Sequence, residues 1–191
     1  MRSHFFAYIS RMRFIQRWAL MRNTAQENVQ EHSHQAAVLA HALAVIRNRR
    51  FGGAVDPGLV AAAALYHDAA EILTGDMPTP IKYGNPAIRA AYKDVEAVAA
   101  RRLLEMLPET LQEAYAPVLT AVDPEVERLV KAADKLSAYI KCVEELKAGN
   151  TEFREAAAQT RRTLEGYGLP EVDYFLETFM ESFSLTLDEL K

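Results

Sequence analysis

The stretch that decides the fold runs from Gly58 to Leu73 and reads Gly-Leu-Val-Ala-Ala-Ala-Ala-Leu-Tyr-His-Asp-Ala-Ala-Glu-Ile-Leu. It is apolar on almost every side of a helix, which predicts a helix inside a hydrophobic core. Apart from one tyrosine, its only ionisable residues are His67, Asp68 and Glu71. At about 100° per residue these three side chains fall within an arc of about 100°, so they share one face.

A buried imidazole beside two carboxylates needs partners. Enclosing such groups together costs several kcal/mol unless they pair with one another or bind a metal ion. The pattern therefore indicates a polar site in the core, and a metal site would need further ligands from other helices. A hydrogen-bonded internal network, or a face turned to solvent, is the alternative that this helix alone leaves open.

The sequence also specifies both ends of this helix. Asp56 supplies an N-cap with Pro57 at the first helical position, and Gly75 ends the helix. Three prolines and two glycines occur in the twelve residues from Gly75 to Pro86, which predicts a non-helical loop. Loops of this length in compact domains often carry function.

The rest of the chain predicts further helices. No stretch shows the period-two alternation that indicates strands, and no linker or repeat divides the chain. We therefore expect an all-α fold, a single-domain helical bundle over residues 1–191 with the metal site between core helices. Asn28 and Glu31 resemble a capping box. The other expected helices, by approximate range, are 3–16, 28–48, 87–106, 124–148, 152–164 and 172–183, with a short element between residues 108 and 117.

Two residues outside the central stretch are candidates for the same site. His32 shares a helix face with apolar residues from Ala36 to Ile46, which turns it inward. A lone histidine on such a stripe is more often a hydrogen-bonded core residue than a ligand. Asp134 borders the apolar stripe of its helix, so the pattern alone favours a solvated aspartate slightly over a ligand. The remaining histidines have no paired acidic motif and are not assigned: His4, His34 and His41.

Composition excludes several classes of protein. Half of the 191 residues are hydrophobic, enough for one core, and the net charge of -4 lacks the basic excess that a nucleic acid polymer requires. Cys142 is the only cysteine, which favours a reducing cytoplasm over an oxidising compartment. Neither a signal peptide nor an apolar run of about 18 residues is visible, so we expect no membrane segment.

The order of the candidate residues resembles a known superfamily. A lone histidine, an adjacent His-Asp pair on the next core helix and a distant aspartate on a later helix are similar to the ligand order of the HD-domain phosphohydrolases. Longer blocks resemble, more specifically, the bacterial 5′-deoxynucleotidases of the YfbR type. They are Ser-His-Phe-Phe-Ala (3–7), Gln-Arg-Trp (16–18), Met-Arg-Asn (21–23), Glu-Asn-Val-Gln-Glu-His-Ser (27–33), Tyr-His-Asp-Ala-Ala-Glu (66–71), Leu-Thr-Gly-Asp-Met-Pro-Thr-Pro-Ile-Lys-Tyr (73–83) and Lys-Ala-Ala-Asp-Lys-Leu (131–136).

This resemblance implies a function and its partners. The expected reaction is removal of the 5′-phosphate from deoxyribonucleoside 5′-monophosphates by a cytoplasmic homodimer that uses a divalent cation such as Co, Mn or Zn. By resemblance, the metal ligands are His32, His67, Asp68 and Asp134. The positions that contact substrate are Arg17, Trp18, His32, Asp68, Asp76, Met77, Pro78, Thr79 and Asp134, with Met77 standing where the family has leucine.

Chemistry suggests roles for Arg17, Trp18, Glu71 and Asp76. Arg17 matches phosphate oxygens with its guanidinium fork and is expected to act in catalysis. Glu71 either orients the attacking water or serves as general acid or base, with a supporting contact to a histidine ligand as the alternative. Asp76 is expected to bond the sugar 3′-hydroxyl. Trp18 either stacks on the nucleoside or anchors the core.

Two alternatives to the 5′-deoxynucleotidase function stay open. One is another HD-type nucleotide phosphohydrolase, such as a dNTP triphosphohydrolase or a cyclic-nucleotide phosphodiesterase, because the ligand set alone is common to them. The other is a catalytically silent nucleotide-binding regulator. A silent protein would show a broken ligand set or lack Glu71, and neither is seen.

Overall fold

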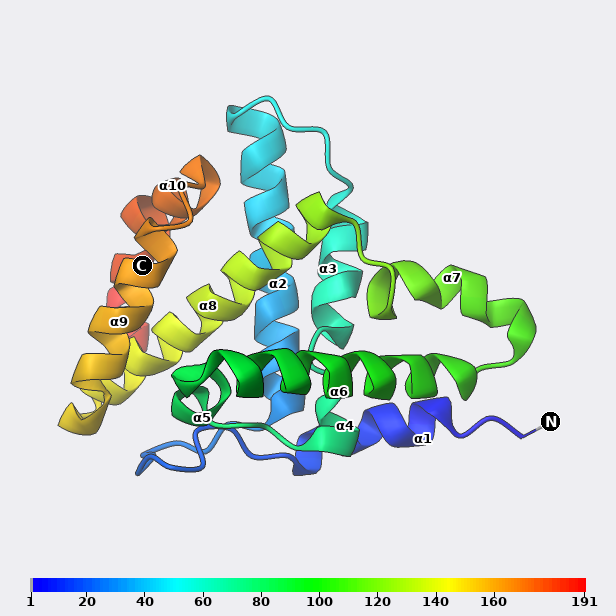
Figure 1. Ribbon diagram of the computed structural model, residues 1–191. Coiled ribbons are helices and arrows are strands. Elements are labelled where there is room, and N and C mark those ends of the chain that lie inside the picture. Colours follow the sequence, from blue (N-terminus) through cyan, green and yellow to red (C-terminus); the bar gives the residue numbers. More distant parts are fainter. Residues whose placement is uncertain (1) are drawn as a thin grey trace.

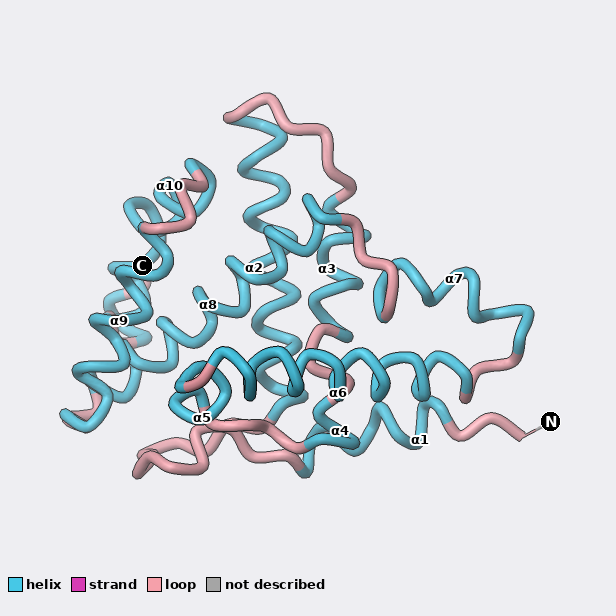
Figure 2. Tube along the Cα trace, viewed as in Figure 1, coloured by secondary structure: helices cyan, strands magenta, loops and turns pink. Residues whose placement is uncertain are grey.

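The computed structural model describes residues 2–191, apart from the side chain of Tyr83, and every regular element in that part of the chain is helical. The all-α prediction is confirmed (Figures 1 and 2). The α-helices are α1 (Phe5–Ile9), α2 (Val29–Arg50), α3 (Pro57–Tyr66), α4 (Glu71–Thr74), α5 (Thr79–Gly84), α6 (Pro86–Glu105), α7 (Glu109–Leu119), α8 (Pro124–Lys147), α9 (Arg154–Glu165) and α10 (Pro170–Phe179). The 3₁₀ turns are η1 (Ser10–Phe14), η2 (Thr151–Phe153), η3 (Met180–Ser184) and η4 (Leu187–Glu189).

The centre of the molecule is formed by α2, α3 and α8, which pack against one another. In Figure 1, α8 crosses α2 diagonally. The facing sides bury small and branched apolar residues, among them Ala40, Leu43, Val60, Leu136 and Ile140. Since alanine side chains let helix backbones approach closely, polar groups on these three helices can meet across the core.

Side-chain caps fix the N-termini of the three central helices. Asn28 and Glu31 form the predicted capping box at the start of α2. Asp56 and Asp123 accept hydrogen bonds from the first amides of α3 and α8, and each is followed by proline at the first helical position. A proline is tolerated there because the helix makes no use of its missing N–H. These caps set where each central helix begins.

A second apolar cluster joins the N-terminal segment to α6 and α7. The ring of Phe5 is fully buried, and its centroid lies 5.4 Å from that of Tyr115 and 6.3 Å from that of Tyr66. In Figure 1, α1 runs below α6. This packing leads the chain into the segment of residues 15–28, which borders the candidate site.

The predicted helix from Pro57 to Thr74 is wrong as a single element, because the chain leaves α-helical geometry at His67 and resumes it at Glu71 (Figure 2). The turn is tightened to i→i+3 bonds, such as Ala69 N–H to the Tyr66 carbonyl at 2.9 Å. A cause is visible in the His67 ring, whose Nδ1 lies 2.7 Å from the carbonyl of Ala64. In a continuous α-helix, that carbonyl would accept from the amide four residues on.

The predicted non-helical loop from Gly75 to Pro86 is also partly wrong, since Thr79–Gly84 forms the short helix α5. Its prolines do not prevent this, because Pro78 precedes the helix and Pro80 lies in its first turn. The predicted N-terminal helix 3–16 is likewise divided, into α1 and the 3₁₀ turn η1. In both segments the residue types do not determine the pattern of backbone hydrogen bonds, and that pattern sets which helix forms.

The C-terminal elements pack on the outside of the central helices. α9 and η2 contact α8, and α10 contacts α2. The expected helix 172–183 begins at Pro170 and changes to the 3₁₀ turn η3 after Phe179. Over residues 2–191, no helix is long and apolar enough to cross a membrane.

Candidate metal centre

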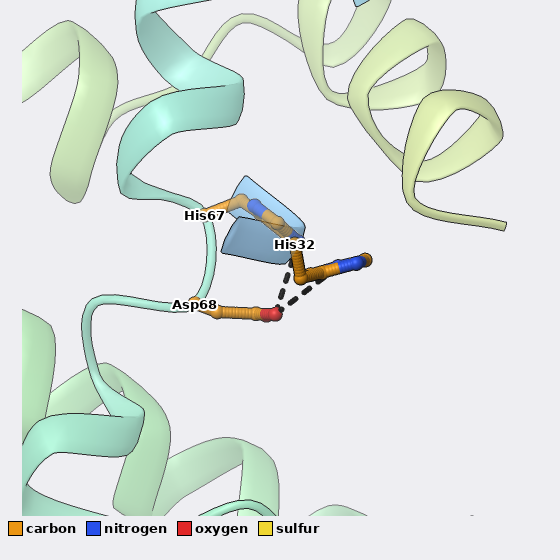
Figure 3. Close-up of side chains that lie close together, drawn as sticks. All are labelled: His32, His67 and Asp68. Carbon is orange, nitrogen blue, oxygen red and sulfur yellow. Dashed lines mark ion pairs between the residues drawn. The ribbon is translucent and has the colours of Figure 1, made fainter. Parts of the chain in front are cut away.

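Three side chains converge at the break between α3 and α4 (Figure 3). His32 comes from α2, and His67 and Asp68 come from the turn. One potential ligand atom from each residue lies within 4.8 Å of the other two. Asp68 Oδ2 is 3.1 Å from His67 Nε2 and 3.5 Å from His32 Nε2. The sequence placed these residues on one helix face, whereas the structure brings them together through the tightened turn.

Asp134 reaches the same cluster from α8. Its Oδ1 lies 3.1 Å from His32 Nε2 and 4.0 Å from His67 Nε2. The side chain is 29% exposed, so Asp134 lies where the cluster opens to solvent. The pattern of α8 slightly favoured a solvated surface aspartate, but the packing of α8 against α2 instead directs this carboxylate at a buried histidine.

The hydrogen bonds of both histidines leave Nε2 as the nitrogen that faces the cluster. His67 Nδ1 lies 2.7 Å from the Ala64 carbonyl, which can only accept, so Nδ1 carries a proton. His32 Nδ1 lies 3.1 Å from Ser137 Oγ, which donates its own proton to Gln35 Oε1 at 2.6 Å. His32 Nδ1 is therefore also a donor. Each Nε2 is buried without a hydrogen-bond partner, and two such atoms beside carboxylates fit a divalent metal ion.

The electrostatics of the cluster favour a bound cation. Burial alone would lower the pKa of His67, but the charges of Asp68 and Asp134 raise it to about 9. The pKa of Asp68 falls below its ordinary value, because His67, His32 and Arg17 outweigh the effect of burial. A proton and a metal ion therefore compete for His67 Nε2, because only the unprotonated nitrogen can bind a metal.

Arg17 lies beside the cluster, on the segment between η1 and α2. Its Nη1 donates to Asp68 Oδ2 at 3.2 Å and its Nε donates to Glu27 Oε2, also at 3.2 Å. Burial would lower the pKa of Arg17, but Asp68, Asp134 and Glu27 raise it above its ordinary value. The guanidinium is thus a fixed positive group next to the candidate ligands.

Trp18 follows directly and is partly buried. Its Nε1 donates to the same Glu27 oxygen at 2.9 Å, and its ring centroid lies 5.3 Å from that of Phe153. The indole therefore packs on the protein as the anchoring interpretation expects, and it stays adjacent to Arg17.

Glu71 opens α4 and is only 5% exposed, with no hydrogen-bond partner for Oε2. Burial, together with the charges of Asp68 and Asp76, raises the pKa of Glu71 to about 9. Burial also raises the pKa of Asp76. Gly75, at φ 74°, lets the chain turn sharply after α4, so Asp76 follows the helix end directly. Both carboxyl groups are thus electrostatic neighbours of the cluster.

The rest of the predicted substrate loop lies at the entrance to α5. Met77 and Pro78 are partly buried, and Thr79 is exposed at the first position of the helix. The hydroxyl of Tyr92 donates to the Gly75 carbonyl at 3.0 Å and so holds the start of the loop against α6.

Some residues fall outside the site and others were missed. His4, His34 and His41 are exposed and lie outside the cluster. Sequence reasoning missed the roles of Glu27 and Ser137, which contact the site residues Arg17, Trp18 and His32. Glu27 opens the motif block 27–33, but that block by itself assigned Glu27 no role.

The fold and the site together define a class of protein. The structure resembles an HD-domain phosphohydrolase from Listeria innocua, with a TM-score of 0.81, 24% identity, and coverage of 94% of this chain and 88% of that one. It also resembles the Cyanophage S-2L HD phosphohydrolase DatZ, solved bound to dA and one catalytic Zn²⁺ ion, with a TM-score of 0.63, 22% identity, and coverage of 92% and 96%. The fold is that of the HD-domain phosphohydrolases.

The sequence narrows this class to one family. The family described as 5′-deoxynucleotidase YfbR-like matches residues 4–183. A 5′-deoxynucleotidase of Photobacterium profundum is 53% identical over 191 residues, which cover 99% of this chain and 98% of that protein. The chain belongs to the YfbR-like 5′-deoxynucleotidase family, and the resemblance carried by the motif blocks is confirmed.

Proposed function

We propose that this chain is a metal-dependent 5′-deoxynucleotidase that hydrolyses deoxyribonucleoside 5′-monophosphates to deoxyribonucleosides and inorganic phosphate. The ligands of the metal are His32, His67, Asp68 and Asp134. The observation that carries this assignment is the pair of buried Nε2 atoms without hydrogen-bond partners, both close to Asp68 and Asp134. Family membership supports the reaction, and this geometry supports the place where it occurs.

When bound, a divalent cation would lower the pKa of a water molecule and offset negative charge on the phosphoryl oxygens. Arg17 is the residue that orients the phosphate. Its fork of N–H donors matches phosphate oxygens, and its contact with Asp68 places that fork next to the ligands. Substrate phosphate would take over the donor that Arg17 now directs at Asp68.

Glu71 is the general acid of the proposed mechanism. Its buried, uncharged carboxyl group holds a proton at neutral pH, as its raised pKa of about 9 indicates. When the bond between phosphorus and the 5′-oxygen breaks, Glu71 gives this proton to the departing oxygen. Water supplies the oxygen that phosphorus gains, and the proton that this water releases balances the one that Glu71 gives up.

The segment from Asp76 to Thr79 and the indole of Trp18 are proposed to hold the nucleoside. Asp76 follows the turn at Gly75 and accepts a hydrogen bond from the sugar 3′-hydroxyl. Met77 and Pro78 supply apolar contacts. A cytoplasmic homodimer is part of this proposal, and a set of histidine and carboxylate ligands suits Co, Mn or Zn.

A phosphate-release assay tests this function. Purified protein, stripped of metal and reloaded with Co²⁺, Mn²⁺ or Zn²⁺, is given matched deoxyribonucleoside and ribonucleoside 5′-monophosphates. We expect free phosphate from the deoxy substrates, and loss of activity on chelation and in His67→Ala. Activity that survives both changes would overturn the metal mechanism. Release of inorganic triphosphate from dNTPs, with no phosphate from monophosphates, would instead favour a triphosphohydrolase.

A further inference from the structure

Glu27 bonds both Arg17 and Trp18, two residues that are predicted to bind substrate. Its Oε2 accepts from Arg17 Nε at 3.2 Å and from Trp18 Nε1 at 2.9 Å. Its backbone carbonyl accepts from the Arg17 amide at 2.9 Å. The side chains of Arg17 and Glu27 are only 12% and 13% exposed, so water contributes little to these contacts. The backbone and the side chain of Glu27 therefore fix both the backbone position of Arg17 and the orientation of its guanidinium.

The N–H donors of Arg17 are shared between two carboxylates. Glu27 takes Nε, whereas Nη1 points to Asp68 in the cluster. A metal ion bound by Asp68 would compete with Arg17 for that carboxylate. Glu27, which is outside the cluster, would then be the carboxylate that still holds the guanidinium. Because Glu27 accepts from Nε of Arg17, the two Nη groups of Arg17 remain available to the phosphate oxygens.

Trp18 needs outside contacts to keep its backbone conformation. It has φ 58°, in the left-handed region that costs a residue other than glycine about 1 kcal/mol. Asn23 Nδ2 donates to the Trp18 carbonyl at 3.3 Å, and the bond to Glu27 fixes the indole at its other end. Because Arg17 and Trp18 are consecutive and share one acceptor oxygen, a shift of either side chain disturbs the other.

Glu27 itself stands on a rigid support. The segment before it is tied to α8, since the buried carboxylate of Glu145 accepts from the amides of Thr24 and Ala25. The segment after it begins the capping box of α2 at Asn28. Glu27 is thus fixed on both sides in the chain, as a residue that positions a catalytic group should be.

We propose that Glu27 is a positioning residue for phosphate recognition, which locks the Arg17 fork toward the cluster and couples it to Trp18. This inference rests on the proposed role of Arg17 in the reaction. Glu27 itself does not contact the reacting atoms. It acts through the angle at which Arg17 meets the phosphate, a displacement of about 1 Å being enough to cost about 100-fold in rate.

The test compares Glu27→Ala, Glu27→Gln, Arg17→Ala and Glu31→Ala in the metal-loaded enzyme. Glu31→Ala is the matched control, because it removes a glutamate side chain that accepts from the Asn28 amide, next to Glu27, without touching Arg17 or Trp18. We expect Glu27→Ala to lower kcat/KM about 100-fold, mostly in kcat, with metal content unchanged. Glu27→Gln keeps an acceptor oxygen, so its kcat/KM should be about tenfold higher than that of Glu27→Ala. Glu31→Ala should lower only the melting temperature.

Tryptophan fluorescence supplies a readout that general destabilisation would not move. Trp18 is the chain's single tryptophan, so emission reports its indole alone. Glu27→Ala should shift the emission maximum in folded protein, whereas Glu31→Ala should not. Wild-type kcat/KM and an unchanged spectrum in Glu27→Ala would overturn the proposal, as would a loss of activity that follows loss of metal. Full activity in Arg17→Ala would instead refute the proposed role of Arg17, and the role of Glu27 with it.

Discussion

His32 Nε2 lies 3.1 Å from Asp134 Oδ1, which joins α2 to α8 at the candidate metal centre. Since His67 and Asp68 come from the turn after α3, the four proposed ligands link the three helices that form the core. Metal binding and folding should therefore be coupled, because a ligand that binds only the folded state stabilises it.

Removing the metal should lower the melting temperature as well as abolish activity. A metal present at about 100 times its dissociation constant adds about 2.7 kcal/mol of stability. Differential scanning calorimetry of chelated and reloaded protein measures the difference. His67→Ala serves as the control, since chelation should then have little further effect. Identical melting curves for chelated and loaded wild type would argue against a metal held between these helices.

Ser137→Ala should weaken metal binding although Ser137 is no ligand. The substitution removes the hydroxyl to which His32 Nδ1 donates, so the ring loses the bond that orients it. Loss of such a supporting bond typically costs about 10–100-fold in metal affinity. Calorimetric metal titration measures this, with His41→Ala on the exposed side of α2 as the control. An unchanged affinity in Ser137→Ala would mean that helix packing alone orients His32.

Glu71→Gln should lower kcat on deoxynucleotides by about 10²–10⁴-fold without loss of metal, because the amide cannot donate the proton that the 5′-oxygen needs. The defect should be much smaller with p-nitrophenyl phosphate, whose leaving group departs without protonation. Measuring kcat of wild type and Glu71→Gln on both substrates tests this prediction. An equal defect on both would point to a role for Glu71 in orienting water.

Asp76→Ala should reduce sugar discrimination. If Asp76 bonds the 3′-hydroxyl and thereby fixes the sugar, its loss should narrow the ratio of kcat/KM between deoxy and ribo substrates about tenfold. Phosphate release from matched monophosphates gives this ratio, and Asp94→Ala, an exposed aspartate of α6, is the control. A parallel fall on both sugars would show that Asp76 takes no part in the choice.

Glu145→Gln should destabilise the protein at neutral pH and less so in acid. Glu145 is 1% exposed and pairs with buried Lys141, and breaking such a pair costs about 3 kcal/mol. Burial would raise the pKa of Glu145, but the bonds from Lys141, Thr24 and Asn150 lower it below its ordinary value of 4.5. The carboxylate therefore contributes stability that is fully present above about pH 4.5 and declines as the pH falls below it.

Urea unfolding of wild type and Glu145→Gln at several pH values measures this contribution. The difference between the two should be constant at neutral pH and should narrow progressively below about pH 4.5. Glu152→Gln, an exposed carboxylate that bonds the same segment through the Arg22 amide, is the control and should change little. A difference that stays constant through the acid range would contradict the assignment.

Much of the fold and the candidate site could be predicted from sequence. Caps at Asn28, Asp56 and Asp123 fixed the starts of the central helices, because these side chains bond amides only two or three residues away. The apolar run around His67 and Asp68 indicated a buried polar site. Such local signals act over a few residues, which is why they can be read without the fold.

The errors came where distant or backbone contacts decide. The break at His67 depends on a ring that competes for the Ala64 carbonyl, and α5 forms although its segment is rich in proline. Asp134 looked like a surface residue because its helix stripe does not include it. Family resemblance, rather than pattern, placed Asp134 among the ligands.

By itself, the sequence determined the all-helical fold, the starts of the core helices, the family and the identity of the candidate residues. Only the tertiary structure decided that His32, His67, Asp68 and Asp134 meet, that both Nε2 atoms are left without hydrogen bonds, and that Glu27 holds Arg17 and Trp18 together. The reason is physical. Helix formation and capping depend on neighbours along the chain, whereas the approach of side chains from α2, α8 and the turn after α3 depends on how the helices pack.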